Sequence, residues 1–96
     1  MFRHIVLISF RPEAAPAERN AVRAALAALP ALVPEIRSFQ SGDNVGKGPN
    51  HHDFATVMDF DDEAAFRRYL ASDAHKAYVA GPATAVARLA VVQHLI

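Results

Sequence analysis

The stretch HIVLISF, His4–Phe10, decides how this chain of 96 residues can fold. It is rich in β-branched and aromatic residues, which favour an extended strand. Side chains alternate along a strand, so this one has two apolar faces: Val6, Ile8 and Phe10 on one, Ile5 and Leu7 on the other. Strands with two apolar faces are covered on both sides, so we expect cover for each face.

The remaining elements follow from hydrophobic spacing and from breaks in it. Ala14–Val33 has Val22, Leu26 and Leu29 at helical spacing, and Pro30 should end or kink this helix near Leu29. Further strands are expected over Glu35–Ser41, His52–Phe60 and Arg88–Ile96. Two short helices are expected over Glu63–Leu70, with Phe66 and Leu70 buried, and over Ser72 to about Val79. Gly42–Asn50 is rich in Gly, Asn and Pro, which is typical of a loop.

The order β-α-β-β-α-β, with the second helix broken in two, predicts an α+β fold of the ferredoxin-like type. Its four-stranded antiparallel sheet would carry helices on one face only. The other face would remain bare, with apolar residues on it: Ile5, Leu7, Ala55 and Val57. We therefore expect a single domain over residues 1–96 that pairs as a homodimer through this face of the sheet.

The composition narrows the classes of partner. The chain is 52% hydrophobic, which for so short a domain also favours an oligomer interface. Its formal charge is zero, which argues against nucleic acid and anionic membranes as partners. No apolar run reaches a membrane span, and no signal-peptide pattern opens the sequence. There is no cysteine, which fits a cytoplasmic protein.

The segment YLASDAHKAYVAG, Tyr69–Gly81, holds the best candidates for chemistry. Ser72 can accept a hydrogen bond from the amide of His75 and so begin a new helix. A helix N-terminus disfavours imidazolium, so His75 would stay neutral, as a general base requires. Tyr69 could donate a hydrogen bond to a developing oxyanion. The alternative is that Tyr69 packs and His75 ties the helix break to the sheet.

Other histidines point less clearly to a site. His4 shares a strand face with Val6, where a lone histidine is usually a hydrogen-bonded residue at the edge of the core. In His51-His52-Asp53 the neighbouring side chains point to opposite faces of a strand, so we expect no metal site built from both histidines. We expect no cofactor.

Four stretches in order resemble the stress-responsive dimeric α/β-barrel (Dabb) family over nearly the whole chain. They are HIVLISF (His4–Phe10), LPALVPEIRSFQSGDNV (Leu29–Val45), DFATVMDFDDEAAFRRYLASDAH (Asp53–His75) and LAVVQHL (Leu89–Leu95). The resemblance implies a ferredoxin-like protomer whose sheet pairs with that of a second chain. Some relatives bind a metal through backbone carbonyls, which would lie near Pro30, Val33 and Ile36.

The resemblance extends to a plant polyketide-cyclase branch that closes rings without a cofactor. It implies a catalytic pair at Tyr69 and His75 in a cavity between sheet and helices, supported by His4. Three positions depart from that branch: a helix tyrosine falls on Leu26, a strand histidine on Phe54, and the acidic residue that orients the base on Gln93.

Two functions follow as hypotheses. The first is a cytoplasmic homodimeric stress-response barrel that binds a small apolar or aromatic ligand. The second is a cofactor-free enzyme, resembling a cyclase or isomerase, with His75 as base and Tyr69 as hydrogen-bond donor. A monooxygenase-like barrel is a weaker form of the second. A cavity lined by His4, Tyr69 and His75 would favour the enzyme.

Overall fold

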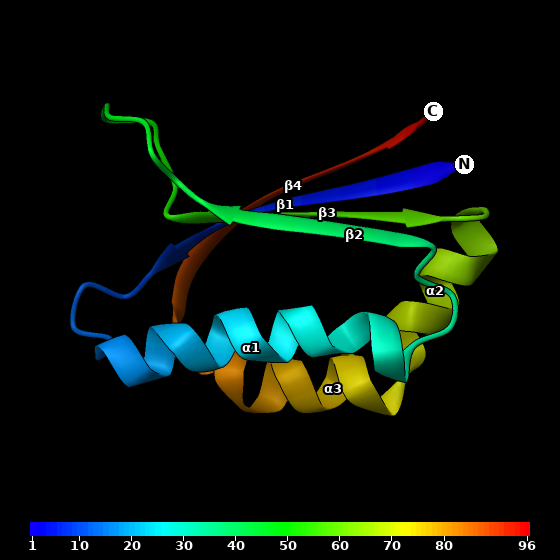
Figure 1. The fold of residues 1–96 in the computed structure, drawn as a ribbon, viewed down its shortest axis with the longest axis horizontal. Coiled ribbons are helices and arrows are strands. Elements are labelled where there is room, and N and C mark those ends of the chain that lie inside the picture. The colour runs from blue at the N-terminus through cyan, green and yellow to red at the C-terminus, as the bar shows by residue number, and fades with distance from the viewer.

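A computed structural model describes residues 1–96 and contains one sheet with its helices on one side (Figure 1). In chain order the elements are β1 (Phe2–Phe10), α1 (Pro16–Leu32), β2 (Ser38–Asp43), β3 (Phe54–Phe60), α2 (Glu63–Ala71), α3 (Asp73–Ala80), the 3₁₀ turn η1 (Pro82–Ala85) and β4 (Val86–Leu95). This is the predicted β-α-β-β-α-β order.

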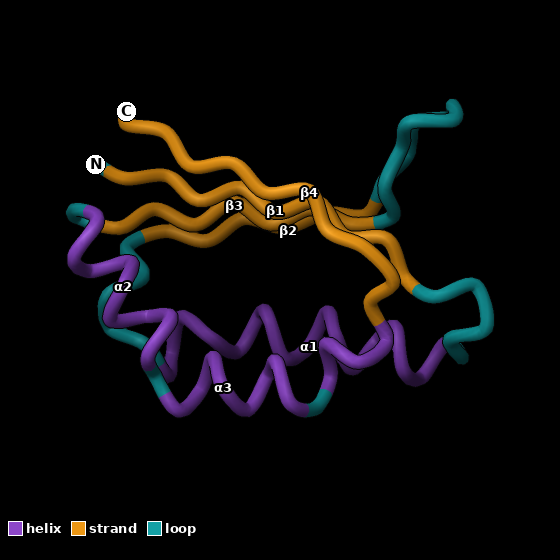
Figure 2. The backbone as a smooth tube through the Cα atoms, turned by 180° about the vertical axis from the view of Figure 1, so that it is seen from behind, coloured by secondary structure: helices purple, strands orange, loops and turns teal.

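The sheet has the strand order β2-β3-β1-β4, and every neighbouring pair is antiparallel. The helices lie together below the sheet, and no element covers its other face (Figures 1 and 2). The predicted ferredoxin-like protomer is therefore confirmed. Near the end of β1 the pairing with β4 shifts by one residue between Ser9 and Phe10, which bends β4 towards the helices.

The core lies between the sheet and α1. Phe60 and Ile8 from the sheet, and Val22, Leu29 and Val33 from the α1 segment, are at most 2% exposed. The helical spacing of the α1 residues places them on one stripe facing the strands. Phe60 also packs against Phe66 of α2, with their ring centroids 5.5 Å apart in an edge-on arrangement. The broken second helix is anchored to the sheet at this contact.

The second face of the sheet is apolar, as predicted, and this chain leaves it uncovered. Ile5 lies directly opposite Val57, and Leu7 directly opposite Ala55. Leu7 is 37% exposed although it occupies the central part of a sheet. At the rim of the same face, Arg3 donates two hydrogen bonds to the Asp59 carboxylate.

One prediction about the helices is wrong, and one of the two effects expected at Pro30 is not seen. Helix α1 does not end near Leu29 but continues through Pro30 to Leu32, within the predicted Ala14–Val33 segment, and the amide of Val33 donates to the Leu29 carbonyl to close the last turn. Pro30 has no amide hydrogen and so removes its own bond of the helical ladder without ending the helix. Leu70 is not buried but 40% exposed, because Tyr69 is the residue that turns into the core.

The strand boundaries also differ from those predicted by a few residues. The second strand begins at Ser38 rather than Glu35, because Pro34 and Glu35 form a turn after α1. The third begins at Phe54 rather than His52, and the fourth covers Val86–Leu95 rather than Arg88–Ile96.

Candidate functional site

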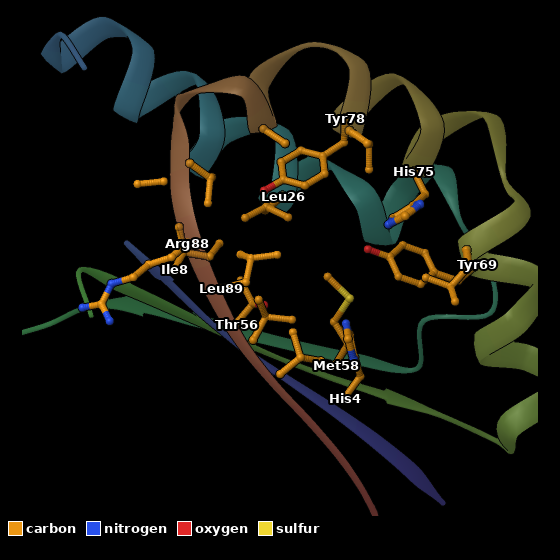
Figure 3. A pocket seen from close by; sticks show the side chains of 17 residues that line it. His4, Ile8, Leu26, Thr56, Met58, Tyr69, His75, Tyr78, Arg88 and Leu89 are labelled. Atoms are coloured by element: carbon orange, nitrogen blue, oxygen red, sulfur yellow. The ribbon is translucent and has the colours of Figure 1, made fainter. Parts of the chain in front are cut away.

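A cavity of about 520 Å³ lies between the sheet and helix α3, and 13 of its 17 lining residues are hydrophobic. Its floor comes from β1, β3 and β4, and its roof from α3 and α1 (Figure 3). Leu89 and Val91 of β4 line the cavity but remain 56% and 51% exposed. The cavity therefore opens to solvent along β4.

Ser72 builds the helix break that holds the two predicted site residues. Its hydroxyl oxygen accepts a hydrogen bond from the His75 amide at 3.2 Å, so the predicted N-cap is confirmed. The same hydroxyl donates to the Tyr69 carbonyl at 2.7 Å and so caps the end of α2. One serine therefore fixes the end of α2 and the start of α3, with a residue of the cavity on each side.

Tyr69 and His75 meet at one end of the cavity (Figure 3). Their ring centroids are 4.8 Å apart and the rings cross edge-on at 68°. Burial, helped by the nearby Tyr78, raises the pKa of Tyr69 to about 12. Burial also lowers the pKa of His75, and an interaction of its ring with the backbone of Leu70 acts in the opposite direction. Both side chains are therefore uncharged near neutral pH.

His4 lies on the floor of the same cavity, next to Met58. Its ring centroid is 4.8 Å from that of Phe66 and 6.5 Å from that of Tyr69. Burial, with the nearby His75 as a smaller cause, lowers the pKa of His4 to about 4. The structure thus brings His4, Tyr69 and His75 together around one cavity.

Tyr78 is a cavity residue that the sequence analysis missed. It lies three positions after His75 on α3, a spacing that puts both side chains on the same helix face. Its hydroxyl points into the cavity beside Leu26 (Figure 3). Burial raises the pKa of Tyr78 as well. The i, i+3 spacing from His75 was the signal that could have found it.

The three positions that depart from the cyclase branch lie in different places. Leu26 lines the cavity, whereas Phe54 does not and instead lies under the guanidinium of Arg23. Gln93 makes no hydrogen bond to His75. It hydrogen-bonds His4 at 2.9 Å because the β1–β4 register sets these two residues opposite each other.

The lining supplies hydrogen-bonding groups but almost no charge. Two tyrosine hydroxyls and two imidazoles face a hydrophobic wall, and the lining contains no carboxylate. Arg88 is its one charged residue, and the guanidinium points away from the end where Tyr69 and His75 meet (Figure 3). Such a site can bind a neutral compound, orient one polar group of it, and pass a proton to or from a neutral imidazole.

The other histidines lie outside this cavity. His52 pairs through its Nδ1 with the Ser9 hydroxyl at 2.9 Å. His94 is exposed near the end of β4. No group of three or more His, Cys, Asp or Glu side chains is placed to hold a metal ion. Of the backbone carbonyls near Pro30, Val33 and Ile36, that of Val33 accepts the amide of Ile36.

Comparison with known proteins agrees with this architecture. Residues 2–93 match the family model described as the stress responsive A/B barrel domain (Dabb). A dimeric ferredoxin-like protein of unknown function from Thermobifida fusca is 34% identical, with a TM-score of 0.86 over 99% of this chain and 90% of that one. A dimeric protein of unknown function from Bacteroides fragilis is 26% identical, with a TM-score of 0.80 over 99% and 95%.

A hydroxynitrile lyase from Passiflora edulis has the same fold, with a TM-score of 0.89 over 99% of this chain and 92% of that one. It is only 18% identical, so the likeness extends to the fold alone. The comparison with curated proteins found no match. None of the helices is both long and apolar enough to cross a membrane.

Proposed function

The chain belongs to the stress responsive A/B barrel (Dabb) family and is similar to solved ferredoxin-like proteins that are dimeric. We propose that it is a homodimer in which each protomer binds a small, neutral, largely apolar compound. One observation carries this proposal: a cavity of about 520 Å³ opens along β4 and is lined mainly by hydrophobic residues, with five uncharged hydrogen-bonding side chains among them. Its volume lies within the usual range for small-molecule sites.

The electrostatics of the cavity favour a neutral ligand. At neutral pH the pKa of about 4 leaves His4 unprotonated, and the pKa of about 12 leaves Tyr69 protonated. A charged ligand would lose hydration on entering without gaining an opposite charge near these groups. An aromatic or alicyclic compound with one or two oxygen atoms matches the lining better.

The proposal has three further parts. The dimer forms through the uncovered face, where Ile5, Leu7 and Val57 are central, because this face is apolar and the similar proteins are dimeric. The protein is cytoplasmic, for which the absence of cysteine is the support. It takes part in a stress response, for which the family description is the support.

Binding can be tested with a panel of small phenols, measured by native mass spectrometry and by calorimetry. Leu89 lines the cavity and is 56% exposed, so Leu89→Trp should fill the cavity without straining the core. We expect the wild type to bind at least one phenol and Leu89→Trp to bind it at least roughly ten-fold more weakly, since the ligand must displace the indole.

Leu32→Trp is the matched control, because Leu32 is 64% exposed on α1 and does not line the cavity. It should bind like the wild type. Equal affinity in Leu89→Trp and wild type would place binding elsewhere and overturn the proposal.

A second candidate function is a cofactor-free enzyme in which His75 is the base and Tyr69 the hydrogen-bond donor. It is favoured by the edge-on contact of these rings, 4.8 Å between centroids, at the same end of the cavity as His4. Their protonation states fit the roles, since the lowered pKa leaves His75 free to accept a proton and the raised pKa keeps the Tyr69 hydroxyl a donor. The Passiflora edulis hydroxynitrile lyase gives a precedent for an enzyme with this fold.

Base catalysis can be tested before a natural substrate is known. A base held over a bound ketone should exchange the hydrogens next to the carbonyl for deuterium in D₂O, which NMR detects. We expect acetophenone to exchange faster with the wild type than with His75→Ala or Tyr69→Phe. If acetophenone binds but its hydrogens exchange no faster than in buffer alone, base catalysis is wrong and only the binding function remains.

A further inference from the structure

The hydrogen bond between Gln93 and His4 fixes where the proton of His4 lies. The Gln93 Nε2 amide group lies 2.9 Å from His4 Nδ1, and an amide NH₂ group can only donate. Nδ1 is therefore an acceptor and carries no proton. A neutral imidazole holds its one proton on the other nitrogen, so Nε2 of His4 is an N–H donor.

This N–H faces the cavity and has no partner in the chain. His4 lines the cavity, and the only hydrogen bond of its side chain is the one to Gln93. No fully enclosed side-chain nitrogen or oxygen lacks a hydrogen bond, so Nε2 of His4, which has no partner, keeps some accessible surface. A donor in an apolar cavity favours a ligand that offers an acceptor, because an apolar ligand would leave it without a hydrogen bond.

We propose that Gln93 holds His4 as a hydrogen-bond donor and that the cavity thereby selects compounds with a carbonyl oxygen, aromatic or alicyclic ketones and aldehydes. The inference rests on the proposed binding function and names the ligand class for that site. Gln93 is a positioning residue, since it acts through His4, and His4 is the residue that touches the ligand.

Tyr69 completes this recognition. The ring centroids of His4 and Tyr69 are 6.5 Å apart, so the His4 N–H and the Tyr69 hydroxyl serve the same end of the cavity. A carbonyl oxygen has two lone pairs and can accept from both donors at once. A phenol or alcohol can accept there too, but it also needs an acceptor for its own hydrogen, which a carbonyl compound does not.

The first test is the tautomer of His4, read from ring ¹⁵N chemical shifts of the free protein at about pH 9, where imidazoles are neutral. The wild type should show Nε2–H. In Gln93→Glu the carboxylate can only accept, so the proton should move to Nδ1. Gln40→Glu, at an exposed position of β2, is the control and should keep the wild-type tautomer. Nδ1–H in the wild type would overturn the inference without any ligand.

The second test compares acetophenone with ethylbenzene, which is nearly the same shape and lacks the oxygen. A substitution that alters the shape of the cavity should change the affinity for both compounds alike. The ratio of the two affinities therefore reports only on the hydrogen bonds to the carbonyl oxygen. We expect this ratio to fall about ten-fold in His4→Phe and in Gln93→Glu at about pH 9, as expected for one lost hydrogen bond. The ratio should be unchanged in Gln40→Glu.

The outcomes separate the two proposals. If both compounds bind and the ratio is the same in all variants, the selection by His4 is wrong while the binding function stands. If neither compound binds the wild type at millimolar concentration, the binding of small aromatic compounds is wrong and the ligand class falls with it.

Discussion

The two faces of the sheet are built by the same alternating strands but meet different surroundings. On the helix-facing side Ile8 and Phe60 are at most 1% exposed, whereas on the other side Leu7 is 37% and Val92 is 52% exposed. The first face is covered by helices of its own chain. The second is bare, and its polar residues, such as the Arg3–Asp59 ion pair, lie towards the rim.

The difference shows where a small protein can place a binding site. The helices do not extend over the outer part of β4, so the covered face keeps a gap in which His4, Tyr69 and His75 are brought together. The bare face has only a smaller pocket of about 300 Å³ at one end, between Leu7, Ala55 and the loop that carries His51 and His52. Its apolar residues form a patch across β3, β1 and β4. This difference supports the proposal that the ligand binds on the helix-facing side and that a second chain packs on the other.

Removing a large side chain from the covered face should have the largest effect. Phe60 is 0% exposed and packs against Phe66 and Tyr69, with ring centroids 5.5 and 5.4 Å away. Phe60→Ala should lower the free energy of unfolding by about 3–5 kcal/mol, measured by urea denaturation. A loss below about 1 kcal/mol would mean that this contact does not anchor α2 to the sheet.

A charged side chain on the bare face should prevent two chains from forming a dimer. Leu7→Asp places a carboxylate in the centre of the apolar patch, where a dimer would have to bury it. Sedimentation at micromolar concentration should show a dimer for the wild type and a monomer or an unfolded chain for this variant. Leu32→Asp, on the exposed side of α1, should remain dimeric. A monomeric wild type would contradict the assignment of this face.

The free energy of unfolding should fall in acid, because His4 and His75 on the covered face resist protonation in the folded chain. The pKa of His4 is about 4 in the folded chain and 6.5 ordinarily, so between these values the unfolded chain binds more protons. Stability is therefore fully present above pH 6.5 and falls as the pH drops towards 4; the lowered pKa of His75 acts in the same direction. Asp59, with a pKa of about 2, titrates below this window.

Urea denaturation at several pH values between 7 and 4 measures this effect. The decline in stability should be smaller in His4→Phe, which has no proton to bind at this position. Parallel curves for the wild type and the variant would show that His4 does not titrate as its burial requires.

The smallest effect is expected at the helix break. Ser72→Ala removes the hydrogen bond that His75 donates to the hydroxyl and should cost about 1 kcal/mol in the free energy of unfolding. Ser41→Ala, at an exposed position of β2, should change stability by less than about 0.5 kcal/mol. Equal changes in the two variants would mean that the cap does not hold α3 in place.

The fold was predictable because local patterns and the overall topology agree. His4–Phe10 has two apolar faces, and Ser72 carries a cap signal at the correct spacing, so strand and helix break both follow from short stretches. The sequence left the effect of Pro30 open, because a proline removes only its own helical bond and the packing around it decides whether the helix continues. The burial of Leu70 was predicted wrongly because the neighbouring Tyr69 can be buried equally well. The packing of Tyr69 against Phe60 decides that Tyr69 enters the core.

The site was predictable in part. Tyr69 and His75 could be found through the break between them, and His4 through the family resemblance. The partnership of Gln93 with His4 depends on the register of two strands that are far apart in the sequence, and no local pattern fixes that register. Tyr78 could have been found from its i, i+3 spacing to His75, which places both side chains on one face of α3.

The division of roles between the two faces can be tested by mapping ligand binding onto side-chain methyl groups by NMR. With saturating 4-ethylphenol, the methyl signals of Val6, Leu26 and Met58, which line the cavity, should shift. Those of Ile5, Leu7 and Val57, on the bare face, should stay unchanged. Saturable shifts confined to the bare face, with none in the cavity, would contradict the account.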